Sequence, residues 1–132
     1  MEFIRNGKVL YTGVVTAGFV GILTGIHPDG YSISINEREL GGEVVTDFLE
    51  GVLEGAWSPT HLVRKTFETA ANYDQSLQML SKGKVTAPVY YITAGKAPGC
   101  GTVLTRDRNF LRDMWTLSPT YTPPKHLSLI HI

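Results

Sequence analysis

The chain has 132 residues, of which 42% are hydrophobic and 18% charged, and its 12 basic residues balance its 12 acidic ones. This size fits one domain with its own core. A neutral chain whose basic residues are scattered gives no electrostatic reason to expect nucleic acid or an anionic membrane as a partner. No run of about 18 apolar residues predicts a transmembrane helix.

Few features of the chain bear on compartment or metal chemistry. The start, Met1 to Lys8, lacks the basic-then-apolar order of a signal peptide, which favours the cytosol if Met1 is the true start. The single cysteine, Cys100, cannot form an internal disulfide. None of the four histidines stands at metal-ligand spacing from a second histidine or from the cysteine. We therefore expect no metal site.

The first part of the chain predicts strands. Residues 7–16 are rich in β-branched and aromatic side chains, and residues 19–24 form a second apolar run interrupted by glycines. The sequence His-Pro-Asp-Gly at 27–30 has turn chemistry. Residues 31–37 then alternate, with Tyr and Ile on one face and Ser and Asn on the other. These features predict a hairpin.

The middle of the chain predicts three helices. Apolar residues recur at helical spacing from Val44 to Leu53. Ser58 is a candidate N-cap, with Pro59 at the first helical position. The inner face of that second helix is expected to carry Leu62, Val63, Phe67 and Ala70. A third, short helix is predicted from Asp74 to a C-terminal cap at Gly83.

From Val85 the period returns to two. Strands are expected at 88–94, 102–106 and 110–117, with a Gly/Pro-rich turn at 95–101, as a second antiparallel group. Strands, then helices, then strands predict an α+β fold over residues 1–117. Residues 118–132 break the pattern, so we expect an irregular tail there.

The strand that ends at Asn36-Glu37-Arg38 is the strongest candidate for a functional site. Strict alternation places Glu37 on the apolar face of its strand, which is costly unless a bulge or a polar cavity accommodates the charge. A carboxylate in such a place can hydrogen-bond a substrate amide. The alternative is a strand-end salt bridge with Arg38 or a neighbour.

Two other candidates have simpler explanations. Cys100 could be a nucleophile, but no histidine base can be assigned to it, and a small turn residue is the favoured interpretation. The run Arg106-Asp-Arg108 is expected to be an exposed turn with local ion pairs.

Four motifs in one order resemble a known family. They are Ala17-Gly-Phe-Val-Gly-Ile-Leu-Thr-Gly25, Ser32-Ile-Ser-Ile-Asn-Glu-Arg38, Ala87-Pro-Val-Tyr-Tyr-Ile92 and Thr105-Arg-Asp-Arg108. They resemble the β-subunit of acid ceramidase and of the related N-acylethanolamine-hydrolysing acid amidase, over about residues 1–117. The resemblance implies part of a four-layer αββα N-terminal nucleophile hydrolase sandwich with antiparallel sheets.

The resemblance also implies a chemistry. In this family a cysteine exposed by self-cleavage attacks the amide of an N-acyl lipid, either ceramide or an N-acylethanolamine, and no cofactor is needed. It implies a catalytic role for Glu37 beside that cysteine, with Asn36 and Arg38 as flanking substrate-binding residues. It further implies a lysosomal parent protein that reaches its lipid at a membrane surface, with an α-subunit cut from the same precursor.

The family's nucleophile has no counterpart in this chain, and Cys100 does not match it. Met1 aligns with the interior of a family strand, and the family's later Asn-Tyr-Asp motif is replaced by the tail at 118–132. We therefore expect a partial, inactive chain whose tail is foreign to the family. The alternative is a complete, small cytosolic α+β protein that binds an apolar ligand or a partner without catalysis.

Overall fold

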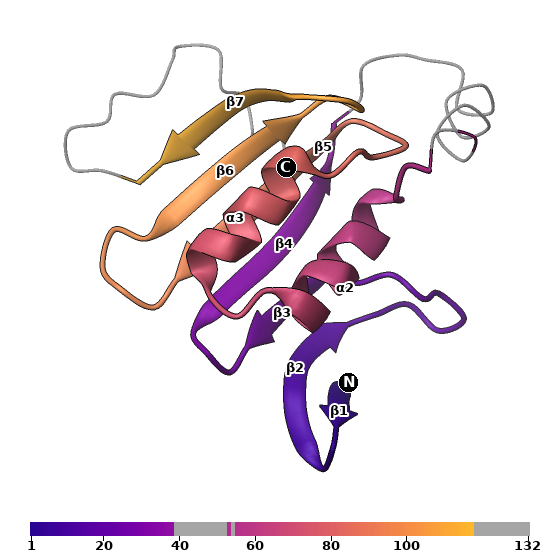
Figure 1. Ribbon diagram of the computed structural model, residues 1–132, viewed down its shortest axis with the longest axis vertical. Helices are drawn as coiled ribbons and strands as arrows, with labels where there is room; N and C mark the ends of the chain where they lie inside the picture. Colours follow the sequence, from indigo (N-terminus) through magenta and orange to yellow (C-terminus); the bar gives the residue numbers. More distant parts are fainter. Residues whose placement is uncertain (39–52, 54, 118–132) are drawn as a thin grey trace.

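The computed structural model describes residues 1–38, 53 and 55–117. Within them, seven strands form one antiparallel sheet, and two helices lie on one of its faces (Figure 1). The elements are β1 (Glu2–Arg5), β2 (Lys8–Val14), β3 (Thr24–His27), β4 (Tyr31–Glu37), α2 (Pro59–Thr69), α3 (Tyr73–Lys82), β5 (Val89–Gly95), β6 (Gly101–Arg106) and β7 (Leu111–Thr116).

The strands follow one another across the sheet in chain order, from β1 to β7. The long connection between β4 and β5 contains α2 and α3, which run in opposite directions over the sheet (Figure 1). The α+β class expected from the sequence is confirmed. The prediction of two separate groups of strands is wrong, because β4 and β5 pair along seven residues each and join all the strands into a single sheet.

The strand expected at 19–24 is also wrong, because the strand lies at Thr24–His27 instead. Residues before it pack against the start of α2: the Ile22 N–H donates to the Thr60 carbonyl at 3.1 Å, and the Ile22 side chain is fully buried. A Cβ at Gly21 would stand 2.2 Å from Thr60 Oγ1. Contact with α2 therefore decides how Gly21 and Ile22 pack, and the strand itself begins only at Thr24.

Strand β1 is an element that the patterns described above do not predict. It pairs with β2 through a tight turn at Asn6-Gly7, where both residues have positive φ, 52° and 75°. An Asn-Gly pair with this backbone is the standard connection of a two-residue hairpin. That dipeptide was the signal that could have identified the hairpin.

The positions and caps predicted for the two described helices are confirmed. The Ser58 side chain accepts from the His61 N–H, and Pro59 occupies the first turn. Helix α3 begins one residue earlier than expected, capped by Asn72, and Gly83 follows its end. The helix predicted at 44–53 lies outside the described residues except for Leu53.

A column of aromatic rings forms the centre of the core. Phe3, Tyr11, Phe67, Tyr31 and His27 stack in that order, with neighbouring centroids 4.3 to 5.7 Å apart. The column therefore joins the β1–β2 hairpin to α2 and to the β3–β4 hairpin, and aromatic pairs contribute beyond the area they bury.

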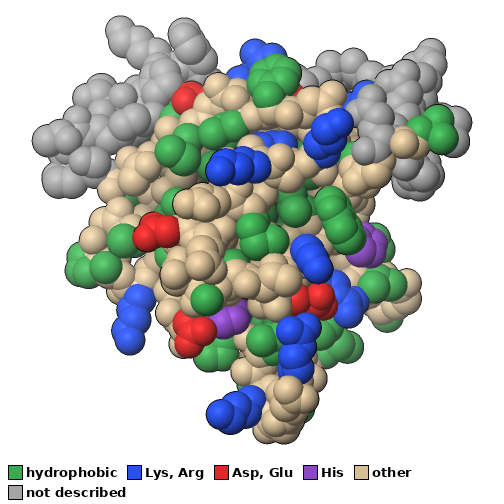
Figure 2. Space-filling model, in the orientation of Figure 1, with side chains coloured by type: hydrophobic (Ala, Val, Ile, Leu, Met, Phe, Trp, Pro, Cys, Tyr) green, Lys and Arg blue, Asp and Glu red, His purple; other side chains and the backbone are tan. Residues whose placement is uncertain are grey.

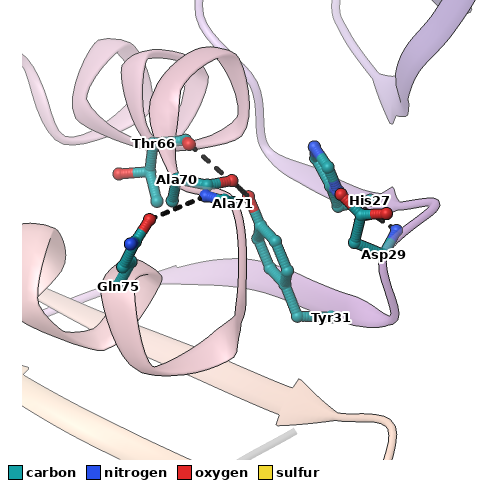
Figure 3. Close-up of polar contacts among 7 residues, drawn as sticks. All are labelled: His27, Asp29, Tyr31, Thr66, Ala70, Ala71 and Gln75. Carbon is teal, nitrogen blue, oxygen red and sulfur yellow. Dashed lines mark hydrogen bonds and ion pairs between the residues drawn. The ribbon is translucent and has the colours of Figure 1, made fainter.

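Tyr31 also joins the sheet to α2 by hydrogen bonds. Its hydroxyl donates to the Ala70 carbonyl at 3.0 Å and to the Thr66 carbonyl at 3.5 Å (Figure 3). Both carbonyls lie at the C-terminal end of the helix, where the Thr66 carbonyl also accepts from the Ala70 N–H at 2.8 Å. This contact fixes the helix end over β4.

The opposite face of the sheet has no helix over it among the described residues. Val14, Ile26 and Ile92 lie on that face and are 59%, 58% and 42% exposed. An apolar side chain on a strand stabilises the fold only when another group covers it and removes its surface from water.

Candidate active site

The candidate site lies at the end of β4. Asn36 pairs with Tyr90 and Glu37 pairs with Val89 in unbroken register. Glu37 is exposed. The prediction of a bulge or a polar cavity around Glu37 is therefore wrong. Side chains alternate between the two faces up to the end of the strand, and the Glu37 carboxylate reaches solvent because the strand ends there.

Arg38 follows the last residue of β4, and its side chain lies on the opposite side of the sheet from Glu37. It forms an ion pair with Asp107, whose carboxylate also accepts from Arg112 Nε at 2.9 Å. Burial alone would raise the pKa of the Asp107 carboxyl, but hydrogen bonds from Arg38 and Arg112 outweigh it and lower that pKa. The Arg38 guanidinium also lies over the Tyr90 ring, 5.9 Å from its centroid. A strand-end salt bridge is thus present, but its acid is Asp107.

The prediction of an exposed turn at Arg106-Asp-Arg108 is wrong for its first two residues. Arg106 is fully buried, and Asp107 is 9% exposed. The Arg106 side chain lies on the same face of β6 as those of Thr102 and Leu104, which is the face that the helices cover. Polar and apolar residues do not alternate in Thr102-Val-Leu-Thr-Arg106, so no local pattern there predicts this burial.

The Arg106 guanidinium has only part of its hydrogen-bonding capacity satisfied. Its Nη2 donates to the Gly83 carbonyl after α3, while Nε and Nη1 have no partner in the structure. Burial lowers the pKa of Arg106, opposed by Tyr91 and Asp107. A buried donor without an acceptor is expensive, so this side chain stands out among the described residues.

Glu37 and Arg106 lie in one row across the sheet. Glu37 pairs with Val89 on β5, and Val89 pairs with Arg106 on β6. Directly paired residues point to the same face, so the carboxylate and the guanidinium share the helix-covered face two strands apart. Asn36 and Arg38 point to the other face. The structure therefore separates the three consecutive candidates into two sides of the sheet.

The remaining candidates occupy ordinary structural positions. Cys100 is a free thiol in the turn between β5 and β6, where its carbonyl accepts from the Gly95 N–H at 2.7 Å. The His27 ring is buried, and its Nδ1 accepts from the Asp29 N–H (Figure 3). Within the part of the chain that the structure describes, no three metal-binding side chains cluster, and neither helix could cross a membrane.

Known proteins resemble this chain in sequence. Bovine (Bos taurus) acid ceramidase is 34% identical over 124 residues, which are 92% of this chain and 31% of that protein. N-acylethanolamine-hydrolyzing acid amidase of Cavia porcellus is 34% identical over 122 residues, or 90% of this chain and 33% of that protein. The chain is a homologue of this acid ceramidase and amidase family. It spans about a third of the length of these curated relatives.

The fold agrees with this homology. A solved structure of the Caenorhabditis elegans N-acylethanolamine-hydrolyzing acid amidase ortholog superposes with a TM-score of 0.77 at 28% identity. The match covers 89% of this chain and 50% of the nematode chain. A scan against models of known protein families gives no match for this chain. The family resemblance seen in the four sequence motifs is therefore confirmed over most of the chain.

Proposed function

We propose that this chain is part of an amidohydrolase that cleaves the amide bond of N-acyl lipids, either ceramide or an N-acylethanolamine. The observation that carries the proposal is the 34% identity to both enzymes across nine-tenths of the chain. The reaction would follow N-terminal cysteine chemistry, in which a thiolate forms an acyl-enzyme that water then hydrolyses.

Within this reaction Glu37 would act at the scissile amide. Its place at an open strand end supports this role, because the carboxylate is carried by a rigid sheet and is accessible to a neighbouring group. Such a carboxylate can accept a hydrogen bond from the substrate N–H and orient the carbonyl toward the nucleophile. Asn36, exposed on the other side of the strand, and Arg38 would bind parts of the substrate further away.

The architecture proposed with this function is the four-layer αββα sandwich. The apolar, uncovered sheet face with Val14, Ile26 and Ile92 supports it, because a second sheet packed there would bury those side chains. Residues 1–117 would supply one sheet and one helix layer. An α-subunit of the same precursor and the rest of the β-subunit would supply the remainder, in a lysosomal enzyme that takes its lipid from a membrane surface.

Substitution of Glu37 tests this role. In the longer protein that would contain this chain, Glu37→Gln keeps the side-chain shape and removes the charge. We expect kcat/KM for a fluorogenic ceramide or N-acylethanolamine to fall by at least about 100-fold, which is typical for the loss of a group that acts in proton transfer or orientation at the reacting bond. Hydrolysis is measured on matured enzyme, so that precursor cleavage is followed separately by gel.

The matched control is Glu2→Gln, which removes the same charge from an exposed position on β1. It should leave kcat/KM within about twofold, as expected for a surface substitution. Normal turnover by the mature Glu37→Gln enzyme would make Glu37 a structural residue only.

The 132-residue chain by itself should be inactive on these lipids, since the proposed nucleophile is not among its residues. The measurement is product release from a fluorogenic ceramide by the purified chain, compared with Cys100→Ser as a check on its one thiol. Hydrolysis that depends on Cys100 would contradict both the assigned chemistry and the assignment of Cys100 as a turn residue.

A further inference from the structure

A groove lies between α2 and α3, at the end where α2 begins and α3 finishes. Its volume is about 760 Å³, within the range of small-molecule sites. Trp57, Leu62 and Met79 line it with apolar surface, and the Trp57 side chain is 46% exposed. An exposed indole beside aliphatic groups is a favourable surface for an alkyl chain.

The polar groups around this groove carry positive charge. Lys65, Lys82 and Lys84 line it, and none of its described lining residues is acidic. Figure 2 shows Lys and Arg side chains close to hydrophobic ones over this end of the two helices. An open apolar groove with ammonium groups beside it complements a molecule with one long apolar tail and one anionic head.

A buried charge reinforces this field from below. Gly83 lines the groove, and its carbonyl accepts from Arg106, whose Nε and Nη1 have no partner. The guanidinium therefore adds positive potential beneath the same end of the groove. In a low-dielectric interior such a charge acts over a longer range than it would in water.

We propose that this groove binds one long-chain carboxylate, with its alkyl chain on Trp57, Leu62 and Met79 and its carboxylate near Lys65 and Lys82. None of Asn36, Glu37 or Arg38 lines the groove, so it is separate from the proposed amide-cleaving site. The binding is independent of turnover and can be measured on the 132-residue chain.

The test is titration with dodecanoate below its micelle concentration, followed by calorimetry on the unmodified chain. Trp57 supplies a second signal in the Trp115→Phe variant, where it is the sole tryptophan of the chain. We expect one site, a change in Trp57 emission, and a Kd that falls up to about fourfold for each added methylene that becomes buried.

Charge reversal tests the role of the lysines. Lys65→Glu with Lys82→Glu should weaken dodecanoate binding at least about tenfold, because two attractions become repulsions. The matched control is Lys8→Glu with Lys96→Glu, which makes the same change in net charge at two positions outside the groove. Circular dichroism checks that all variants are folded, and the control should bind as the parent does.

Three results would overturn the proposal. If dodecan-1-ol bound as tightly as dodecanoate, the lysines would contribute nothing to binding of the carboxylate group. Equal weakening by both lysine pairs would reduce the effect to net charge. Binding to vesicles of phosphatidylcholine and phosphatidylglycerol without any binding of monomeric dodecanoate would make the surface a membrane contact. Normal turnover by the Glu37→Gln enzyme would leave the groove proposal intact, because dodecanoate binding is measured separately and depends on other residues.

Discussion

At the scale of single residues, two buried tyrosines in one aromatic column have opposite hydrogen-bonding states. The Tyr31 hydroxyl donates to two carbonyls of α2, whereas the Tyr11 hydroxyl is buried without a partner. Burial raises the pKa of both, that of Tyr11 to about 12. Their loss should therefore have different consequences.

We expect Tyr31→Phe to lower the free energy of unfolding by about 1–2 kcal/mol, because the Ala70 carbonyl loses its buried donor. Tyr11→Phe should be neutral or stabilising, because it removes only an unsatisfied hydroxyl. Urea unfolding monitored by circular dichroism measures both. Equal destabilisation by the two substitutions would contradict the assigned hydrogen bonds.

His27 gives the fold a dependence on pH. Burial lowers its pKa below the ordinary value of 6.5, and the Asp29 carboxylate partly opposes this shift. Above about pH 6.5 the imidazole is neutral in both the folded and the unfolded chain, and stability is complete. As pH falls toward the folded pKa, only the unfolded chain takes up the proton, so stability declines.

The expected result is a falling free energy of unfolding between about pH 7 and 5, with a smaller slope in His27→Phe, which keeps the ring but cannot titrate. Asp29→Asn removes the opposing charge and should make the loss on acidification steeper. Urea titrations at a series of pH values provide the measurement. An unchanged slope in His27→Phe would assign the pH dependence to other groups.

At the scale of elements, the approach of α2 to the sheet depends on one glycine. A Cβ at Gly25 on β3 would stand 2.8 Å from the Thr12 carbonyl oxygen and 2.9 Å from Phe67 Cε2. Both distances are shorter than real contacts of a Cβ allow. The β3 backbone and the Phe67 ring are therefore packed as closely as glycine permits.

Gly25→Ala should destabilise the chain by about 1–3 kcal/mol, the usual cost of overpacking a core. A smaller side chain at the facing position, Phe67→Leu, should recover part of this loss in the double variant, so the two changes should be non-additive. Thermal and urea unfolding of both single variants and the double variant test this. Simple additivity would show that the helix is not in contact at Gly25.

The elements also show how far local sequence patterns reach. Both described helices followed from spacing and caps, because Ser58, Pro59 and Gly83 act on their own neighbours. The strand expected at 19–24 failed, because contact with Thr60, more than thirty positions away, decides where that segment packs. Local chemistry predicts elements well where the deciding contacts are themselves local.

At the scale of the whole molecule, the family followed from the sequence, while the arrangement of the candidate site did not. Alternation put Glu37 on the covered face, but only the end of the sheet there makes it exposed. The ion pair of Arg38 with Asp107 and the burial of Arg106 need the register of β4, β5 and β6, which no local pattern gives. Whether Glu37 acts in catalysis stays a prediction.

The chain-order arrangement of the sheet has a consequence for how the protein is made. Each described strand pairs with the strand that precedes it in the chain, and apart from β4 and β5 the partners are joined by short connections. Strand pairs joined by short connections lose little loop-closure entropy when they form, whereas β4 and β5 must close the long connection that contains α2 and α3. On a ribosome, the hairpin of β1 and β2 could close before β5 is synthesised. The aromatic column would then assemble in steps, beginning with Phe3 and Tyr11 and gaining Phe67 only after α2 has emerged.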